Sequence, residues 1–146
     1  MQTFLPYPSF AESASVLDNK RLGKQRVEAK QIYLALTVPN YGWKNHPAVK
    51  MWAGCEESLL RYGLFICLEW TGRGFKDSLY EYFWDEIEKT FPRADEDILV
   101  PSWIGNQQFH ASHRSNLLRK DTEHYGKFGW SEPNDLPYYW PTKQTQ

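Results

Sequence analysis

The sequence has few cysteines and no long hydrophobic run, and these shortages exclude several classes of protein. Cys55 and Cys67 are its two cysteines among 146 residues. Both fall in a segment predicted to be one helix, where about 1.5 Å of rise per residue separates them by roughly 18 Å, too far for a disulfide. Free thiols favour a reducing, cytoplasmic location. No apolar run reaches the roughly 18 residues of a membrane span, and the N-terminus lacks the apolar core of a signal peptide.

An excess of positive charge is also missing. The formal net charge is -1, so no strong overall field attracts nucleic acid. The charges are unevenly distributed, however: residues 20–30 and 110–127 are rich in basic side chains, and residues 77–97 are rich in acidic ones. The chain holds 7 Trp, 9 Tyr and 8 Phe, and flat rings can stack on bases or sugars. Local binding of phosphates therefore remains compatible with the composition.

The sequence contains no convincing β-strand, and we predict a single all-α domain over residues 1–146. Apolar residues recur at helical spacing. The predicted helices are a short one that opens at Ser9 and longer ones over residues 18–36, 47–71, 78–89 and 106–120. Residues 90–104 and the aromatic tail after residue 124 are predicted to be irregular. The expected N-caps of the helices that follow them are Asn106, Ser78 and either Asn45 or His46.

Glu28 is a lone carboxylate in a basic stretch that also contains Lys20, Arg21, Lys24, Arg26 and Lys30. At 100° per residue, Arg21, Lys24 and Glu28 share one polar face of the helix over residues 18–36. Glu28 is either a partner of Lys24 at i−4 or the acid/base group of a site that holds anions. Gly23 costs about 1 kcal/mol relative to alanine inside a helix, which indicates that another backbone or a ligand approaches this turn.

His110, His113 and Arg114 lie at i, i+3 and i+4, on one face of the helix over residues 106–120. This face either belongs to an ordinary surface helix or contacts phosphates and sugars. The spacing matches no standard metal motif, so no metal is expected. His46 is similarly open to two interpretations, as a helix cap or as part of an anion site.

Four segments resemble the pyrimidine dimer DNA glycosylase family. They are LDNKRLGKQRVEAKQI, NHPAVKMW, GLFICLEWTGRGF and FHASHRSNLLRKDTEHYGKFGW, and together they extend over most of the chain. The resemblance implies a compact all-α domain of about three main helices that binds duplex DNA with a displaced base. It implies cleavage of the N-glycosidic bond of a damaged or modified pyrimidine, followed by AP lyase cleavage of the backbone through β-elimination.

The resemblance also implies which residues act. The family nucleophile is the N-terminal α-amine, which we assign to Met1 because a side chain as large as Gln2 is expected to prevent removal of the initiator methionine. Glu28 matches the family's essential glutamate, and Arg21 falls where the characterised repair enzyme has a histidine. The residues implied to bind DNA are Lys20, Lys24, Arg26, His46, His110, His113, Arg114, Arg119 and Lys120. No cofactor is implied, and a monomer is expected.

This assignment is chemically reasonable. A primary amine in a cationic pocket can attack the sugar carbon, and a carboxylate beside it stabilises the developing oxocarbenium charge and moves protons. Arg21, Lys24, Arg26, His113 and Arg114 are expected to line one groove that clamps phosphates. Two alternatives stay open: an enzyme that cleaves the N-glycosidic bond of another nucleotide or modified base, and a non-catalytic nucleic-acid-binding module of the same fold.

Overall fold

The computed structural model describes residues 1–92 and 98–141, and helices are the regular secondary structure in these two ranges. Its helices are α1 (Phe10–Val16), α2 (Asn19–Thr37), α3 (Pro47–Lys50), α4 (Glu56–Gly72), α5 (Leu79–Thr90), α6 (Gln107–Lys120), α7 (Thr122–Tyr125) and the 3-10 turn η1 (Gly126–Phe128). The predicted all-α class is confirmed, and no strand occurs in these two ranges. Part of the predicted irregular stretch over residues 90–104 lies outside the described residues.

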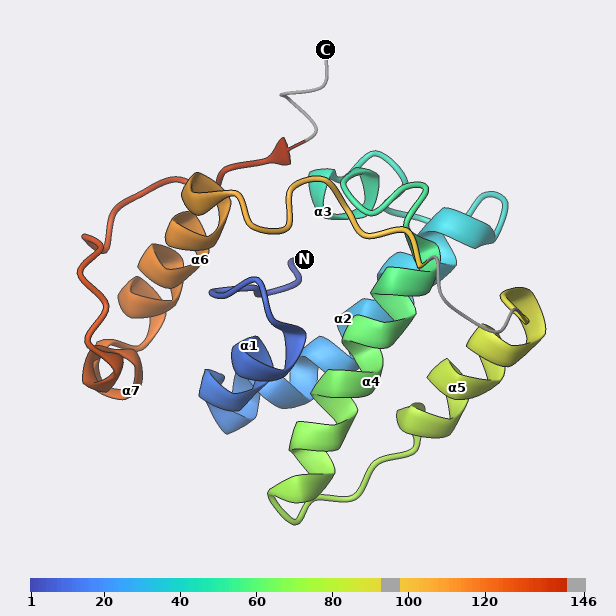
Figure 1. Cartoon of the computed structure of the whole chain (residues 1–146), viewed down its shortest axis with the longest axis horizontal. Coiled ribbons are helices and arrows are strands. Elements are labelled where there is room, and N and C mark those ends of the chain that lie inside the picture. Colours follow the sequence, from blue (N-terminus) through green and yellow to red (C-terminus); the bar gives the residue numbers. More distant parts are fainter. Residues whose placement is uncertain (93–97, 142–146) are drawn as a thin grey trace.

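Helices α2 and α4 form the centre of the fold, and α1 and α5 pack against α4. Leu22 and Ile32 of α2 and Leu60 and Ile66 of α4 are fully buried. The close approach of α5 depends on Gly63 of α4, because a Cβ at that position would lie 2.6 Å from the ring of Phe83. Figure 1 shows α6 on the other side of the N-terminal segment, opposite the α2–α4 pair.

The long helix predicted over residues 47–71 is interrupted, and that prediction is wrong in this respect. It consists of α3 and α4, separated by turns over residues 51–55. Gly54 in this connection has a φ of 85°, a left-handed conformation that ends a helix and favours glycine. Cys55 therefore precedes α4 rather than lying within the same helix as Cys67, and both thiols are free.

Most predicted helix starts are confirmed by side-chain caps. Ser9 Oγ accepts from the backbone N–H of Glu12, and Asn106 Oδ1 accepts from that of Phe109. Ser78 is the exception, because it makes no side-chain cap. Its neighbour Asp77 accepts the N–H of Tyr80 at 2.7 Å instead.

The group that lies closest to Gly23 is a side chain and not another backbone, so that part of the prediction is wrong. A Cβ at Gly23 would lie 2.8 Å from the Trp70 ring, and this ring stacks on Phe75 at 4.2 Å. The glycine thus permits the close crossing of α2 and α4.

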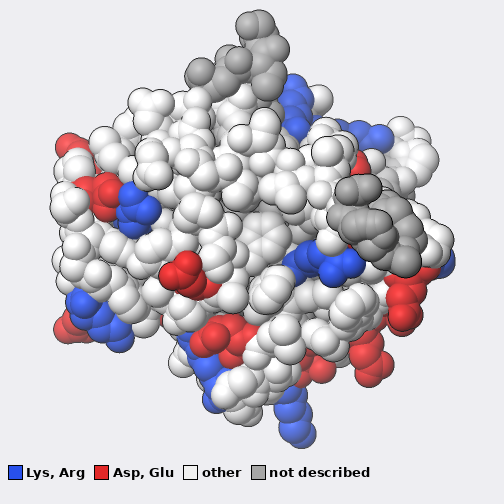
Figure 2. Space-filling model, in the orientation of Figure 1, with Lys and Arg blue, Asp and Glu red and all other residues white. Residues whose placement is uncertain are grey.

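The face shown in Figure 2 carries Lys and Arg in several separate groups with Asp and Glu near them, in keeping with the near-zero net charge. No helix in residues 1–92 or 98–141 combines the length and hydrophobicity that crossing a bilayer requires.

Candidate active site

The N-terminal segment runs into the protein interior. Residues 2–5 are buried, and Thr3 and Leu5 are 0% exposed. The segment lies between α6 and the pair α2–α4 (Figure 1). Because it is extended and no strand adjoins it in the described chain, its backbone polar groups must be paired by side chains.

Helices α2 and α4 supply the first set of these side chains. The backbone N–H of Gln2 donates to Glu28 Oε1 at 2.8 Å. Gln25 accepts from the N–H of Phe4 and donates to the carbonyl of Gln2, both at 2.9 Å. The Tyr62 hydroxyl lies 2.9 Å from the Phe4 carbonyl oxygen and 2.7 Å from Gln25 Oε1. These bonds fix the segment in one register. The α-amine belongs to Met1, the residue before Gln2, whose N–H is bonded to Glu28.

Helix α6 holds the segment from the other side. The N–H of Leu5 donates to His113 Nδ1 at 2.9 Å, and the carbonyl of Leu5 lies 2.8 Å from His110 Nδ1. Arg114 Nη1 donates to the carbonyl of Pro6 at 2.7 Å. Burial lowers the pKa of His110, and it lowers the pKa of His113 to about 3. The two imidazoles are therefore neutral, buried supports of the N-terminal segment, and they do not form the exposed face open to phosphate contact.

A pocket of about 330 Å³ opens where the N-terminus meets Glu28. It combines parts of the chain that are distant in sequence: the first residues, the N-terminal half of α2, the end of α6 and the C-terminal segment. Its lining residues are Met1, Gln2, Phe4, Lys20, Arg21, Lys24, Gln25, Glu28, Lys120 and Tyr138. Six of the predicted site residues therefore meet in one place, namely Met1, Lys20, Arg21, Lys24, Glu28 and Lys120.

The pocket is strongly cationic around one buried carboxylate. Glu28 is 8% exposed, and Lys24 Nζ lies 3.7 Å from its Oε2. Burial lowers the pKa of Lys120, and the positive charges of Arg21, Arg119 and Lys24 lower it further. Mutual repulsion of this kind is relieved when an anion binds among the cations. The arrangement suits an anionic ligand held among these cations.

His46 caps a helix and also interacts electrostatically with groups of the pocket. Its Nδ1 accepts from the N–H of Ala48 at 3.0 Å, so it caps α3 as expected. Burial lowers its pKa, and the Met1 α-amine lowers it further, while Glu28 acts in the opposite direction. The imidazole is therefore within electrostatic range of both catalytic candidates, although it does not line the pocket.

Three arginines of the predicted set lie outside the pocket because protein groups hold them elsewhere. Arg26 Nη1 lies 3.0 Å from Asp77 Oδ1, and its guanidinium covers the ring of Trp70. Arg114 Nη2 lies 2.7 Å from Glu132 Oε2. Arg119 donates to the side chain of Asn116 and the carbonyl of Asn134. The expected groove of Arg21, Lys24, Arg26, His113 and Arg114 is thus reduced in this structure to its first two members, joined by Lys20 and Lys120.

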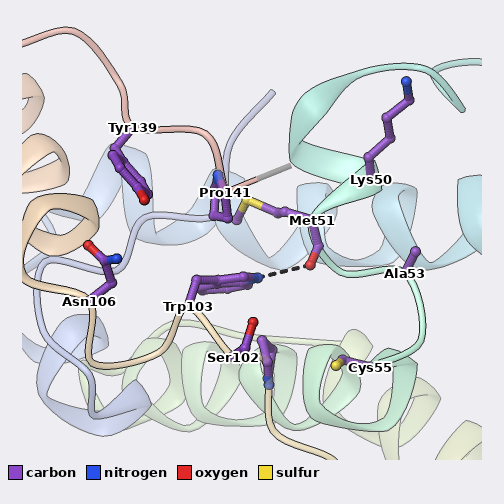
Figure 3. Close-up of a pocket in the computed structure, with 10 residues that line it drawn as sticks. Lys50, Met51, Ala53, Cys55, Ser102, Trp103, Asn106, Tyr139 and Pro141 are labelled. Atoms are coloured by element: carbon purple, nitrogen blue, oxygen red, sulfur yellow. Dashed lines mark hydrogen bonds between the residues drawn. The ribbon is translucent and has the colours of Figure 1, made fainter. Parts of the chain in front are cut away.

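A larger pocket, of about 470 Å³, lies between the α3–α4 connection and the segment before α6. Its described lining includes no carboxylate, and Lys50 is its sole charged residue. Figure 3 shows Lys50 extending away from Trp103, whose indole N–H donates to the Met51 carbonyl at 2.9 Å. Without an acid or a directed cation, this cavity lacks the groups that the smaller pocket offers. The described chain also contains no group of three His, Cys, Asp or Glu side chains that could hold a metal ion.

Two residues of the candidate site were not predicted from the sequence, Gln25 and Tyr138. Gln25 follows Leu22 by three positions and precedes Ala29 by four, so it lies in the buried stripe of α2. A glutamine among buried apolar residues signals a polar partner in the interior. Tyr138 lines the pocket from the C-terminal segment, and no local pattern distinguishes it from the other aromatics of that tail.

The fold and the site define a helical protein that can hold an anionic ligand beside a primary amine and a buried carboxylate. Residues 1–80 match the family described as pyrimidine dimer DNA glycosylase. The match covers more than half of the chain and includes Met1, Arg21 and Glu28, and the chain therefore belongs to this family. Membership implies DNA glycosylase activity and a DNA substrate. Comparison with curated proteins and with solved structures finds no match.

Proposed function

We propose that the chain excises a damaged or modified pyrimidine from duplex DNA at the pocket of Met1 and Glu28. The observation that carries this proposal is the 2.8 Å bond from the Gln2 N–H to Glu28 Oε1. It supports an α-amine close to Glu28, because Met1 directly precedes Gln2 and lines the same pocket as this carboxylate. A nucleophile, an acid/base group and phosphate-binding cations are then available within a single site.

In the proposed reaction the Met1 amine nitrogen attacks C1′ of the sugar. A C–N bond forms, and the base leaves with the electron pair of the glycosidic bond. Glu28 stabilises the positive charge that develops on the sugar and accepts a proton from the amine nitrogen. The proton then passes to the ring oxygen as the sugar opens to an imine. Loss of a C2′ proton from this imine expels the 3′ phosphate, which is the lyase step.

The four cationic side chains of the pocket bind phosphates of the DNA backbone and take no part in the bond-breaking steps. Lys20, Arg21, Lys24 and Lys120 line the pocket with Glu28, and phosphates on either side of the target nucleotide bind to them. Such contacts position DNA without reading its sequence. Arg21 is the cation that the family resemblance implies to be catalytic. Its Nη1, however, lies 3.2 Å from Asp18 Oδ1 and is paired with that carboxylate. We therefore assign it to phosphate binding and orientation.

The test is base release by Glu28→Gln on irradiated duplex DNA, where base release means cleavage of the N-glycosidic bond, measured as new alkali-labile sites and strand breaks. The substitution keeps an acceptor for the Gln2 N–H and removes the charge, so we expect base release to be lost while the Kd for DNA stays within a few-fold. Glu69→Gln is the matched control, because Glu69 also forms an i,i+4 pair, with Arg73 at 2.9 Å, and it does not line the pocket. Near-normal single-turnover release by Glu28→Gln would return Glu28 to the role of an ion-pair partner.

A further inference from the structure

Trp43 is a large aromatic side chain that the fold leaves in solvent. It is 61% exposed, whereas Trp52 and Trp103 are buried in the core. Burying a ring of this size stabilises a folded protein by a few kcal/mol. The exposed Trp43 ring does not contribute this stabilisation, whereas the buried tryptophans do. It is located in the connection between α2 and α3 (Figure 1).

The backbone at Trp43 is also strained. Its φ is 73°, in the left-handed region, and Asn40 of the same connection has a φ of 62°. Asparagine tolerates this region, but a bulky residue such as Trp rarely adopts it. The conformation is held by a bond from the His46 N–H to the Trp43 carbonyl at 2.9 Å. Strain of this kind together with exposure is typical of residues that contact a ligand.

Trp43 stands at the end of a row of rings that begins at the candidate active site. Tyr138 lines the pocket with Glu28. From Tyr138 the ring centroids are 5.5 Å to Trp140, then 6.0 Å to His46 and 6.1 Å to Trp43. His46 in turn is within electrostatic range of the Met1 amine and Glu28. The exposed indole is therefore connected to the pocket-lining Tyr138 through two intervening rings, those of His46 and Trp140.

We propose that Trp43 stacks on a nucleobase of the bound DNA, next to the nucleotide whose base is released. This inference rests on the proposed function, since it takes the pocket of Glu28 as the site of the target sugar. An aromatic ring can hold any base by its flat face, so the contact supports binding without reading sequence. With the pocket cations on the phosphates, the ring would keep the neighbouring base in place while the target base is displaced.

The experiment measures binding to a duplex with a tetrahydrofuran abasic analogue, which cannot form an imine, so the result does not depend on catalysis. We expect Trp43→Ala to raise the Kd about fivefold to a hundredfold, and Trp43→Phe to recover most of the affinity. A 2-aminopurine base placed in turn on either side of the analogue and opposite it should change its fluorescence on binding at one of these positions. That change should be lost in Trp43→Ala.

Two further variants separate stacking from other effects. Trp84→Ala is the matched control, because Trp84 is 36% exposed on α5 and contacts Arg61; its Kd should equal that of the wild type. Trp43→Gly removes the ring and relieves the positive φ, so it should be at least as stable as the wild type in urea and still bind DNA weakly.

A Kd for Trp43→Ala within twofold of the wild type, with the 2-aminopurine signal unchanged, would overturn the stacking proposal while Glu28 could still be catalytic. A wild-type protein that self-associates through Trp43 and binds DNA equally well without it would also overturn it. Weakened binding by Trp43→Ala together with normal base release by Glu28→Gln would instead retain the stacking contact and reject the proposed active site.

Discussion

The backbone nitrogen of Gln2 lies 2.8 Å from Glu28 Oε1, and this bond links the start of the chain to the middle of α2. The donor in this bond is the backbone N–H of Gln2, so the bond does not depend on which side chain residue 2 carries. Its geometry is maintained by neighbouring groups, and these provide the first test of the site.

Gln25→Leu should release the N-terminal segment. The change leaves the Phe4 N–H and the Gln2 carbonyl, both now bonded to Gln25, without their partner. Buried unpaired groups cost about 1–3 kcal/mol each, so we expect the free energy of unfolding in urea to fall by at least ~2 kcal/mol. The rate of base release should decrease by a larger factor than the fraction of folded protein, because the Met1 amine is no longer held in a fixed position relative to Glu28. Gln31→Leu, on the same helix and half-buried, is the control.

The salt dependence of DNA binding tests the cationic pocket. Lys24→Ala and Lys120→Ala should each reduce the slope of log Kd against log salt concentration by about one, because each removes one phosphate contact. Lys89→Ala is a close control: Lys24 is 72% exposed and paired with Glu28, and Lys89 is 73% exposed and paired with Glu86. Equal slopes for all three variants and the wild type would place the phosphate site on another surface.

Much of this architecture is predictable from sequence, because helix periodicity and caps are local signals. The stripe of Arg21, Lys24 and Glu28 also needs only helix geometry, and these three residues do line one pocket. The role of α6 is different. A face with His110, His113 and Arg114 looks the same in sequence whether it binds an external phosphate or an internal peptide. Only the tertiary path of the N-terminal segment decides between them.

The arginines show the same limit. Arg26 and Arg114 are as cationic in sequence as Arg21, yet each is paired with a carboxylate far from it along the chain, Asp77 and Glu132. Long-range pairing of this kind leaves no local pattern. The interruption at Gly54 was missed for another reason, because a single glycine in an apolar stripe is tolerated in many helices.

The buried histidines should make stability depend on pH. The pKa of His113 is lowered from 6.5 to about 3, so the unfolded chain binds more protons than the folded protein between these values. The stabilisation is complete above about pH 6.5 and decreases as the pH falls toward 3, by up to ~1.4 kcal/mol per pH unit. Urea unfolding of wild type and His113→Phe at pH 7.5 and pH 5 measures this.

The His113→Phe variant should be less stable at pH 7.5, since the Leu5 N–H loses its acceptor, but it should lose less stability on acidification. His110, whose pKa burial also lowers, supplies the remaining pH dependence. His124→Phe controls for removal of one histidine. An equal loss of stability in wild type and His113→Phe between the two pH values would contradict the account of a neutral, buried imidazole.

Gly23→Ala should destabilise the protein although alanine favours helices by about 1 kcal/mol. The new methyl group would lie 2.8 Å from the Trp70 ring, whose indole N–H is bonded to the Lys76 carbonyl at 2.8 Å, so the ring has little freedom to move. We expect a net loss of ~1 kcal/mol. Gly72→Ala, with open space around the added Cβ, should be neutral or stabilising. Lost base release at unchanged stability would instead indicate that a ligand approaches Gly23.

The most direct test of the central claim is borohydride trapping on irradiated duplex DNA, followed by mass spectrometry of the trapped peptide. Intact mass should first show that Met1 is retained with a free amine. The account predicts a covalent protein–DNA adduct whose reduced sugar is attached to the Met1 nitrogen, and no adduct from protein with a methylated or tagged N-terminus. Base release at full rate by the tagged protein, or an adduct on Lys24 or Lys120 in place of Met1, would contradict it.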